Sequence, residues 1–195
     1  MRMKQIILMI GFVFVGLISI AQTKKYDSTM KIGKAGYRII CNNKSAEKNS
    51  INIAPIGFES GVRDITIDIK GTVNKAEVDD FNRDGFPDVV LYIFNGGVKN
   101  MGSVLAISSN KNEGMNPIFF PDLLDDAKLK QGYYGHDEFA LIEGTIMRKF
   151  PLYNMADSSN ISPNGNIRFI QYKLTYGEGG MMRFKMERTF DRIKP

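Results

Sequence analysis

The chain has few of the side chains that carry most redox, metal and acid–base chemistry. Its 195 residues include one cysteine, Cys41, and one histidine, His136. A single cysteine cannot form an internal disulfide, and one Cys with one His is too few for the usual zinc ligand sets. Cys41 follows Ile39 and Ile40 in an apolar run, which favours a small core residue over a nucleophile.

The sequence also lacks a dense basic cluster. The formal net charge is +5, but the Lys and Arg residues are spread along the chain. A nucleic-acid footprint needs a basic stripe or patch, so we expect no nucleic-acid partner. The charge allows only weak attraction to an anionic partner.

Residues 1–21 predict a cleaved signal peptide. Arg2 and Lys4 precede an apolar run, and small residues, Ser19 and Ala21, stand where a signal peptidase reads the chain. The run is shorter than the roughly 20 residues that span a bilayer, so we expect no membrane span in the mature protein. We expect secretion, to the periplasm or the cell exterior, and the sequence indicates no particular oligomeric state.

After the signal, we expect a loosely ordered polar leader at 22–36 and a single domain at 37–195. Apolar residues in that domain alternate with polar ones, as at Ile65, Ile67 and Ile69, which is typical of strands with one buried face. The run Val89–Phe94 is apolar throughout, which predicts a central strand buried on both faces. These patterns predict strands at 37–41, 51–56, 65–69, 73–78, 89–94, 103–108, 138–143, 145–151, 170–176 and 182–187.

The predicted fold is all-β. Strands separated by regular turns, including a tight hairpin at Glu143-Gly144, predict an antiparallel β-sandwich of about eight to ten strands. One short helix is predicted after Asp122, because acidic residues come early and basic residues late in the segment that ends at Gly132.

The most specific short motif is DFNRDGFPD, residues 80–88. Oxygen-bearing side chains fall at alternate positions, and such a loop can wrap Ca²⁺. The ligands would be Asp80, Asn82, Asp84 and Asp88. Leu91 stands where an EF-hand needs glutamate, so the loop resembles instead the calcium loops of FG-GAP and integrin-type β-repeats. The alternative is a turn whose side chains satisfy the backbone.

His136 is followed by Asp137 and Glu138, and a His-carboxylate pair can perform acid–base catalysis. However, no serine or cysteine stands in a recognisable nucleophile context, and adjacent carboxylates on a strand point to opposite faces. We therefore expect His136 and Asp137 to fix a loop by hydrogen bonds, with a hydrolase that uses His136 and a carboxylate as the alternative.

Three segments resemble the periplasmic inhibitors of I-type (invertebrate-type) lysozyme, the PliI family. They are GYYGHDEFALIEGTIMRKFPLY at 132–153, DFNRDGFPDVVLYIF at 80–94 and NIRFIQYKLTYGEGG at 166–180, and order and spacing agree over about 37–190. The resemblance implies an antiparallel β-sandwich without catalytic activity, which binds an I-type lysozyme and inserts a loop into its active-site cleft.

The loop that corresponds to the inhibitory loop of the family is Asn95–Ser103. Gly102 and Ser103 match a Gly-Ser pair, Met101 stands where the family has an aromatic residue, and Lys99-Asn100 replace small hydroxyl residues. We expect this loop to protrude, with Met101 as its apolar plug, and exposed residues of the Gly-His-Asp segment to add a second contact. The expected partner-binding residues are Gly96, Gly97, Lys99, Asn100, Met101, Gly102, Ser103, Tyr133, Tyr134 and His136. A calcium-binding secreted or cell-surface module without inhibitory activity is the alternative.

Overall fold

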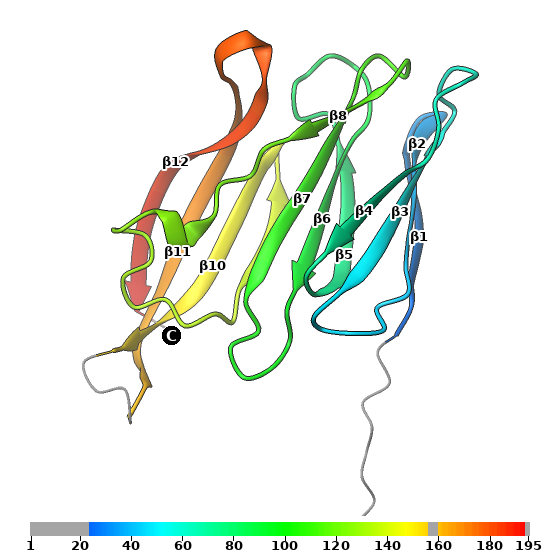
Figure 1. Ribbon diagram of the computed structural model, residues 1–195. Helices are drawn as coiled ribbons and strands as arrows, with labels where there is room; N and C mark the ends of the chain where they lie inside the picture. Colours follow the sequence, from blue (N-terminus) through cyan, green and yellow to red (C-terminus); the bar gives the residue numbers. More distant parts are fainter. Residues whose placement is uncertain (1–23, 156–159, 194–195) are drawn as a thin grey trace, which may run out of the picture.

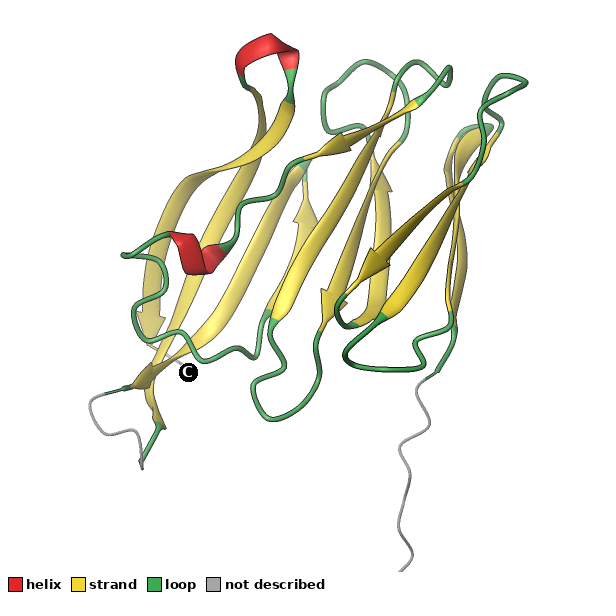
Figure 2. Cartoon of the chain, viewed as in Figure 1, coloured by secondary structure: helices red, strands yellow, loops and turns green. Residues whose placement is uncertain are grey.

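The computed structural model describes residues 24–155 and 160–193, and these residues form an all-β fold (Figures 1 and 2). The predicted signal peptide, residues 1–21, lies outside the described residues. The strands form three four-stranded antiparallel sheets. The first sheet contains β1 (Tyr26–Ile32), β2 (Ala35–Cys41), β3 (Asn49–Ile56) and β4 (Ile65–Ile69); the central sheet β5 (Thr72–Asp79), β6 (Asp88–Phe94), β7 (Gly102–Ser109) and β8 (Met115–Ile118); and the third sheet β9 (Glu138–Ile142), β10 (Thr145–Asn154), β11 (Ser162–Tyr176) and β12 (Met182–Ile193).

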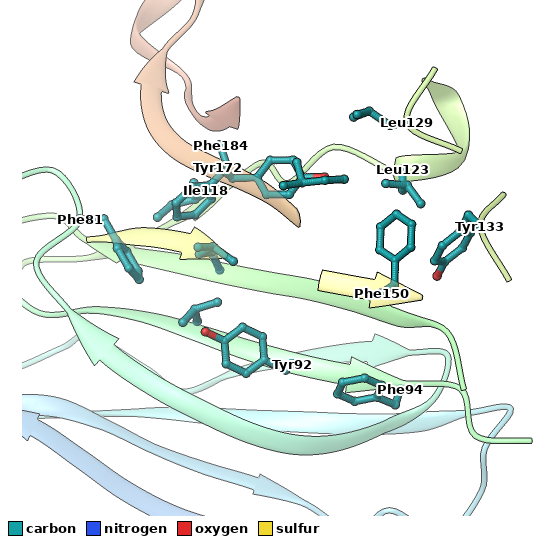
Figure 3. Packing of buried hydrophobic residues seen from close by; sticks show 14 of the residues in the cluster. Phe81, Tyr92, Phe94, Ile118, Leu123, Leu129, Tyr133, Phe150, Tyr172 and Phe184 are labelled. Carbon is teal, nitrogen blue, oxygen red and sulfur yellow. The ribbon is translucent and has the colours of Figure 1, made fainter. Parts of the chain in front are cut away.

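The three sheets are stacked as layers with two hydrophobic cores between them. One core lies between the first and central sheets and includes Tyr37, Ile39 and Cys41, so the prediction that Cys41 is a core residue is confirmed. The other core lies between the central and third sheets and is rich in aromatic rings, such as Phe150 and Phe184 (Figure 3).

Strand β6 contributes side chains to both hydrophobic cores. All its residues are buried, with Val89, Leu91 and Ile93 in one core and Val90, Tyr92 and Phe94 in the other. This two-sided burial explains the unbroken apolar run and confirms the expectation of a central strand. Each strand predicted from the alternating pattern is present as well, and the Glu143-Gly144 turn joins β9 to β10 through two residues with positive φ.

Several expectations were wrong. Residues 22–36 were expected to form a loose leader, but the described part contains β1, which pairs with β2 along its whole length. The Tyr26 hydroxyl accepts a hydrogen bond from Ala76 N at 2.9 Å, which ties β1 to β5. β8 was not predicted, and the described strands outnumber the eight to ten expected and form three sheets. The predicted helix is only a 3₁₀ turn at Leu123–Asp125, although Asp122 caps it as expected, by accepting from Leu124 N.

The segment between β8 and β9 covers one side of the core between the central and third sheets. Phe119 exchanges backbone hydrogen bonds with β12, from Phe119 N to Met182 O at 3.0 Å and from Phe184 N to Phe119 O at 2.8 Å. Further along, Arg168 Nη1 donates to the carbonyl oxygens of Lys128, Leu129 and Gln131. This irregular segment is therefore held in place before it reaches Tyr133. None of the helical turns in the described ranges is long and apolar enough to cross a membrane.

Candidate functional site

The connection between β6 and β7 is a closed, protruding loop. Phe94 and Gly102 form the last pair of the β6–β7 ladder. Beyond it, Asn95 N donates to Met101 O at 3.1 Å, and Met101 N donates to Asn95 Oδ1 at 2.8 Å. Residues 96–100 therefore form the tip of the loop, which extends from one end of the central sheet (Figure 1).

The tip of the β6–β7 loop lies against the Gly-His-Asp segment. His136 N donates to Lys99 O at 2.7 Å. Gly135 has a φ of 85°, and a Cβ at this position would overlap the Lys99 carbonyl oxygen. Only glycine permits so close an approach of two backbones at positive φ, so the glycine before His136 is what lets the two segments touch.

Aromatic side chains surround this contact. Lys99 Nζ lies 4.8 Å from the centroid of the Tyr134 ring. The Tyr153 ring lies 5.3 Å from that of Tyr134 and 5.9 Å from that of His136, between centroids. We call Tyr134, His136 and Tyr153 the aromatic cluster. It sits beside the loop tip, where the Lys99 ammonium lies over one of its rings.

A buried ion pair between Asp137 and Arg148, which we call the anchor, holds the base of the loop in place. Arg148 Nε donates to Asp137 Oδ1 at 2.7 Å, and both side chains are almost fully buried. The other oxygen, Asp137 Oδ2, accepts from Gly102 N at 2.6 Å and from the Tyr133 hydroxyl at 2.5 Å. Arg148 Nη2 donates to Gly102 O at 3.2 Å and to the Tyr133 oxygen at 3.1 Å. Both backbone groups of Gly102 are therefore bonded to this pair.

The electrostatics of the anchor favour a charged Arg148. Burial by itself would lower the pKa of the guanidinium, but the neighbouring Asp137 carboxylate more than offsets this and the pKa is raised. Burial also raises the pKa of the Tyr133 hydroxyl, so it stays a neutral donor to Asp137. Each buried charge is therefore compensated and hydrogen-bonded, so that removing one partner would leave the other charge buried and unpaired.

The structure brings most of the predicted partner-binding residues together, but with different roles. Gly97, Lys99 and Ser103 are exposed, whereas Gly96, Asn100, Tyr134 and His136 are half-buried. Tyr133 was expected to be exposed, which is wrong: it is 8% exposed, and its hydroxyl is bonded to Asp137.

Met101 was expected to be the apolar plug of the loop, but the structure does not place it at the tip. Its side chain is partly buried and packs against the core between the central and third sheets, because the hydrogen bonds with Asn95 turn this residue back toward the ladder. Val98 is the apolar residue of the tip instead, at 81% exposed.

Sequence reasoning also missed Arg148 and Tyr153. A signal for Arg148 was present, because it occupies an inward position of β10 between Ile146 and Phe150, which are fully buried. A charged residue at such a position requires a buried partner. Nothing in the local sequence of Tyr153 indicated that its ring would meet His136.

A cavity of about 310 Å³ lies at the base of the loop, on the side of the β8–β9 segment. Met101, Gly102, Tyr133 and Arg148 contribute to its wall, together with Leu123 from the 3₁₀ turn. The anchor therefore forms part of a surface depression beside the loop.

The Asp80–Asp88 loop uses its oxygens for backbone hydrogen bonds. Asp80 accepts from Asp84 N at 3.0 Å and from Gly85 N at 2.8 Å. Asp88 is buried, which raises its pKa to about 6, and it accepts from Phe81 N and Ser109 N. Across 24–155 and 160–193, no group of three or more His, Cys, Asp or Glu side chains is arranged to hold a metal. Asp80 and Asp88 thus satisfy backbone groups in this structure, and calcium binding by the loop stays a prediction.

The two carboxylates that follow His136 in the sequence contact basic residues. Asp137 is committed to Arg148, and Glu138 is exposed and forms a salt bridge with Lys149 at 2.8 Å. Asp137, which precedes β9, is buried, whereas Glu138, the first residue of β9, is exposed, so the two carboxylates point in different directions. His136 stacks on Tyr153 instead, which leaves the loop tip and the aromatic cluster as the candidate site.

Comparisons of the chain with protein-family models, with curated proteins and with solved structures find no match. The resemblance to the PliI family therefore remains a prediction.

Proposed function

We propose that this protein is a secreted inhibitor-like binding protein that blocks the cleft of an I-type lysozyme with its β6–β7 loop. The observation that supports the proposal most directly is the seating of the loop. Its base is bonded to the buried Asp137–Arg148 pair through Gly102, and its tip is bonded to His136 through Lys99. A loop held in one conformation before binding loses less conformational entropy when it binds.

The side chains of the tip suit a cleft that contains carboxylates. Lysozymes hydrolyse glycosidic bonds with a pair of acidic residues in an open groove. Lys99 can pair with such a carboxylate, and exposed Val98 supplies an apolar contact. Gly96 and Gly97 leave the backbone of the tip accessible.

The aromatic cluster supplies the rest of the contact. A stable inhibitor complex buries about 1,200–2,000 Å² in total, which is more than one loop tip provides. Tyr134 and His136 are half-buried and lie directly beside Lys99, so they extend the same surface. Tyrosine at the centre of an interface often contributes a large share of binding energy.

The test is inhibition of a purified I-type lysozyme acting on a bacterial cell-wall suspension. Val98→Ala/Lys99→Ala removes the exposed side chains of the tip and spares Met101, which packs on the core. The matched control is Val62→Ala/Arg63→Ala, an apolar and basic pair in the β3–β4 connection. We expect the tip variant to raise the inhibition constant at least about tenfold and the control to match wild type. The proposal is wrong if wild type does not inhibit, or if both variants inhibit as well as wild type.

A further inference from the structure

The outer face of the third sheet gathers basic residues that are dispersed in the sequence. Ile146, Arg148 and Phe150 point into the core, so the alternate residues of β10 point outward, and the antiparallel register extends this face over β11 and β12. The basic side chains on the outer face are Lys149 of β10, Lys173 of β11, and Arg183, Lys185, Arg188 and Arg192 of β12. We call these residues the basic face. The third sheet is an outer layer of the molecule (Figure 1).

Acidic residues neutralise only part of this face. Glu138 pairs with Lys149 at 2.8 Å, and Glu187 lies 3.8 Å from Lys173. Arg183, Lys185, Arg188 and Arg192 are exposed and form no salt bridge with any other described residue. The edge strand β12 therefore presents a row of uncompensated positive charges along its length.

Aromatic rings hold two of these arginines in place. Phe169 and Phe190 are cross-strand partners with parallel rings 5.1 Å apart. The guanidinium carbons of Arg188 and Arg192 lie 5.6 and 5.0 Å from the centroid of Phe190, and Arg192 also lies 5.8 Å from Phe169. Cation–π contacts orient a guanidinium without neutralising its charge, and Arg188 is also held by a hydrogen bond from its Nη2 to Gln171 Oε1 at 3.3 Å.

We propose that the basic face binds a linear anionic polysaccharide through the carboxylate or sulfate groups of that polymer. Arg188 and Arg192 are four residues apart on β12, about 13 Å along the strand, and they flank Phe190, so their two guanidiniums form a pair on the outer face. Planar guanidiniums can engage carboxylate or sulfate oxygens with paired hydrogen bonds. Lys185 and Lys173, which are cross-strand partners, continue the positive charge beyond the arginines.

A polysaccharide fits this face better than a single-stranded nucleic acid. Sequence-independent binding of single strands depends on aromatic faces that stack with bases. On this sheet, Arg188 and Arg192 lie over Phe190, and Phe169 lies against it. These rings therefore already pack against side chains of the sheet and are not free to stack with bases. The predicted export signal also favours a polymer of the cell envelope or its surroundings.

The test measures binding to heparin and to polygalacturonate at low ionic strength, with a single-stranded oligothymidylate of similar length as the third ligand. The variant is Arg188→Glu/Arg192→Glu, and the control with the same change of net charge is Lys31→Glu/Lys34→Glu, at the β1–β2 turn of the first sheet. Arg188→Gln/Arg192→Gln serves if charge reversal prevents folding. We expect wild type and the control to bind at least one polysaccharide, with affinity that falls as salt rises. Both arginine variants should bind at least about tenfold more weakly.

Three results would overturn the proposal. They are no polysaccharide binding by wild type, equal losses in the arginine variants and the control, or tighter binding of wild type to the oligonucleotide. Because the basic face does not include the β6–β7 loop, Val98→Ala/Lys99→Ala should keep polysaccharide binding. Failure of this proposal and failure of lysozyme inhibition are thus separate outcomes.

Discussion

Asp137 and Arg148 form a buried ion pair, 2.7 Å between Arg148 Nε and Asp137 Oδ1, that joins β7, β10 and the segment before β9. Its remaining hydrogen bonds go to both backbone groups of Gly102 and to the Tyr133 hydroxyl. The position of the β6–β7 loop therefore depends on a charge pair in the interior.

Arg148→Met should destabilise the protein strongly. The substitution leaves the Asp137 carboxylate buried without a cation, and breaking a buried pair in this way costs about 3–5 kcal/mol of unfolding free energy. Lys149→Met is the control, since Lys149 is the next residue of β10 and its salt bridge with Glu138 is exposed. The control should lose less than about 1 kcal/mol. Urea denaturation measures both, and similar losses would mean that the buried pair contributes little.

Gly135→Ala should cost more stability than another Gly→Ala change at positive φ. Gly97 has a φ of 70° with open space around its Cβ direction, so Gly97→Ala tests the backbone strain alone, about 1 kcal/mol. Gly135→Ala adds the overlap with Lys99 O, which should cost about 1–3 kcal/mol more and displace the loop tip from His136. Equal free energies of unfolding for the two variants would show that the two segments are not in close contact.

The apolar pattern was sufficient to predict the described strands other than β1 and β8, because each of them places apolar residues on a face that packs against a core. It could not show which strands share a sheet, since the same pattern suits two layers or three. β8 escaped prediction because Met115–Ile118 is short and contains Pro117. β1 falls in the expected leader because its apolar residues, Tyr26, Met30 and Ile32, are few, and none of them is fully buried.

The candidate site was predictable only in part. The family resemblance indicated the β6–β7 loop, residues near the Gly-His-Asp segment were expected to add a second contact, and the structure places the two segments side by side. Exposure within the site could not be read from residue type, as Tyr133 and Met101 demonstrate. The basic face was missed because its charges occur at alternate positions of separate strands, which the sequence shows as a dispersed distribution.

Asp80→Asn distinguishes a hydrogen-bonded turn from a calcium loop. Asp80 accepts two backbone hydrogen bonds, and asparagine can replace only one of its two oxygens. A purely structural role predicts a loss of about 1 kcal/mol that is the same in calcium and in excess chelator. If Asp80 binds calcium, chelator should lower the wild-type melting temperature and abolish the difference between wild type and variant. Melting curves of both proteins in the two buffers decide between these roles.

Met101 and Val98 should respond in opposite ways to replacement by tyrosine. The Met101 side chain packs against the core beneath the loop, so Met101→Tyr must displace its neighbours and should lose about 1–3 kcal/mol of unfolding free energy. Val98 is 81% exposed at the tip, so Val98→Tyr should change stability by less than about 0.5 kcal/mol. If the tip enters a lysozyme cleft, Val98→Tyr should also strengthen inhibition, because a rigid aromatic ring adds contact area at little entropic cost. Chemical denaturation and lysozyme inhibition are measured on the same preparations. Improved inhibition by Met101→Tyr with unchanged stability would mean that Met101 is the residue that reaches the partner.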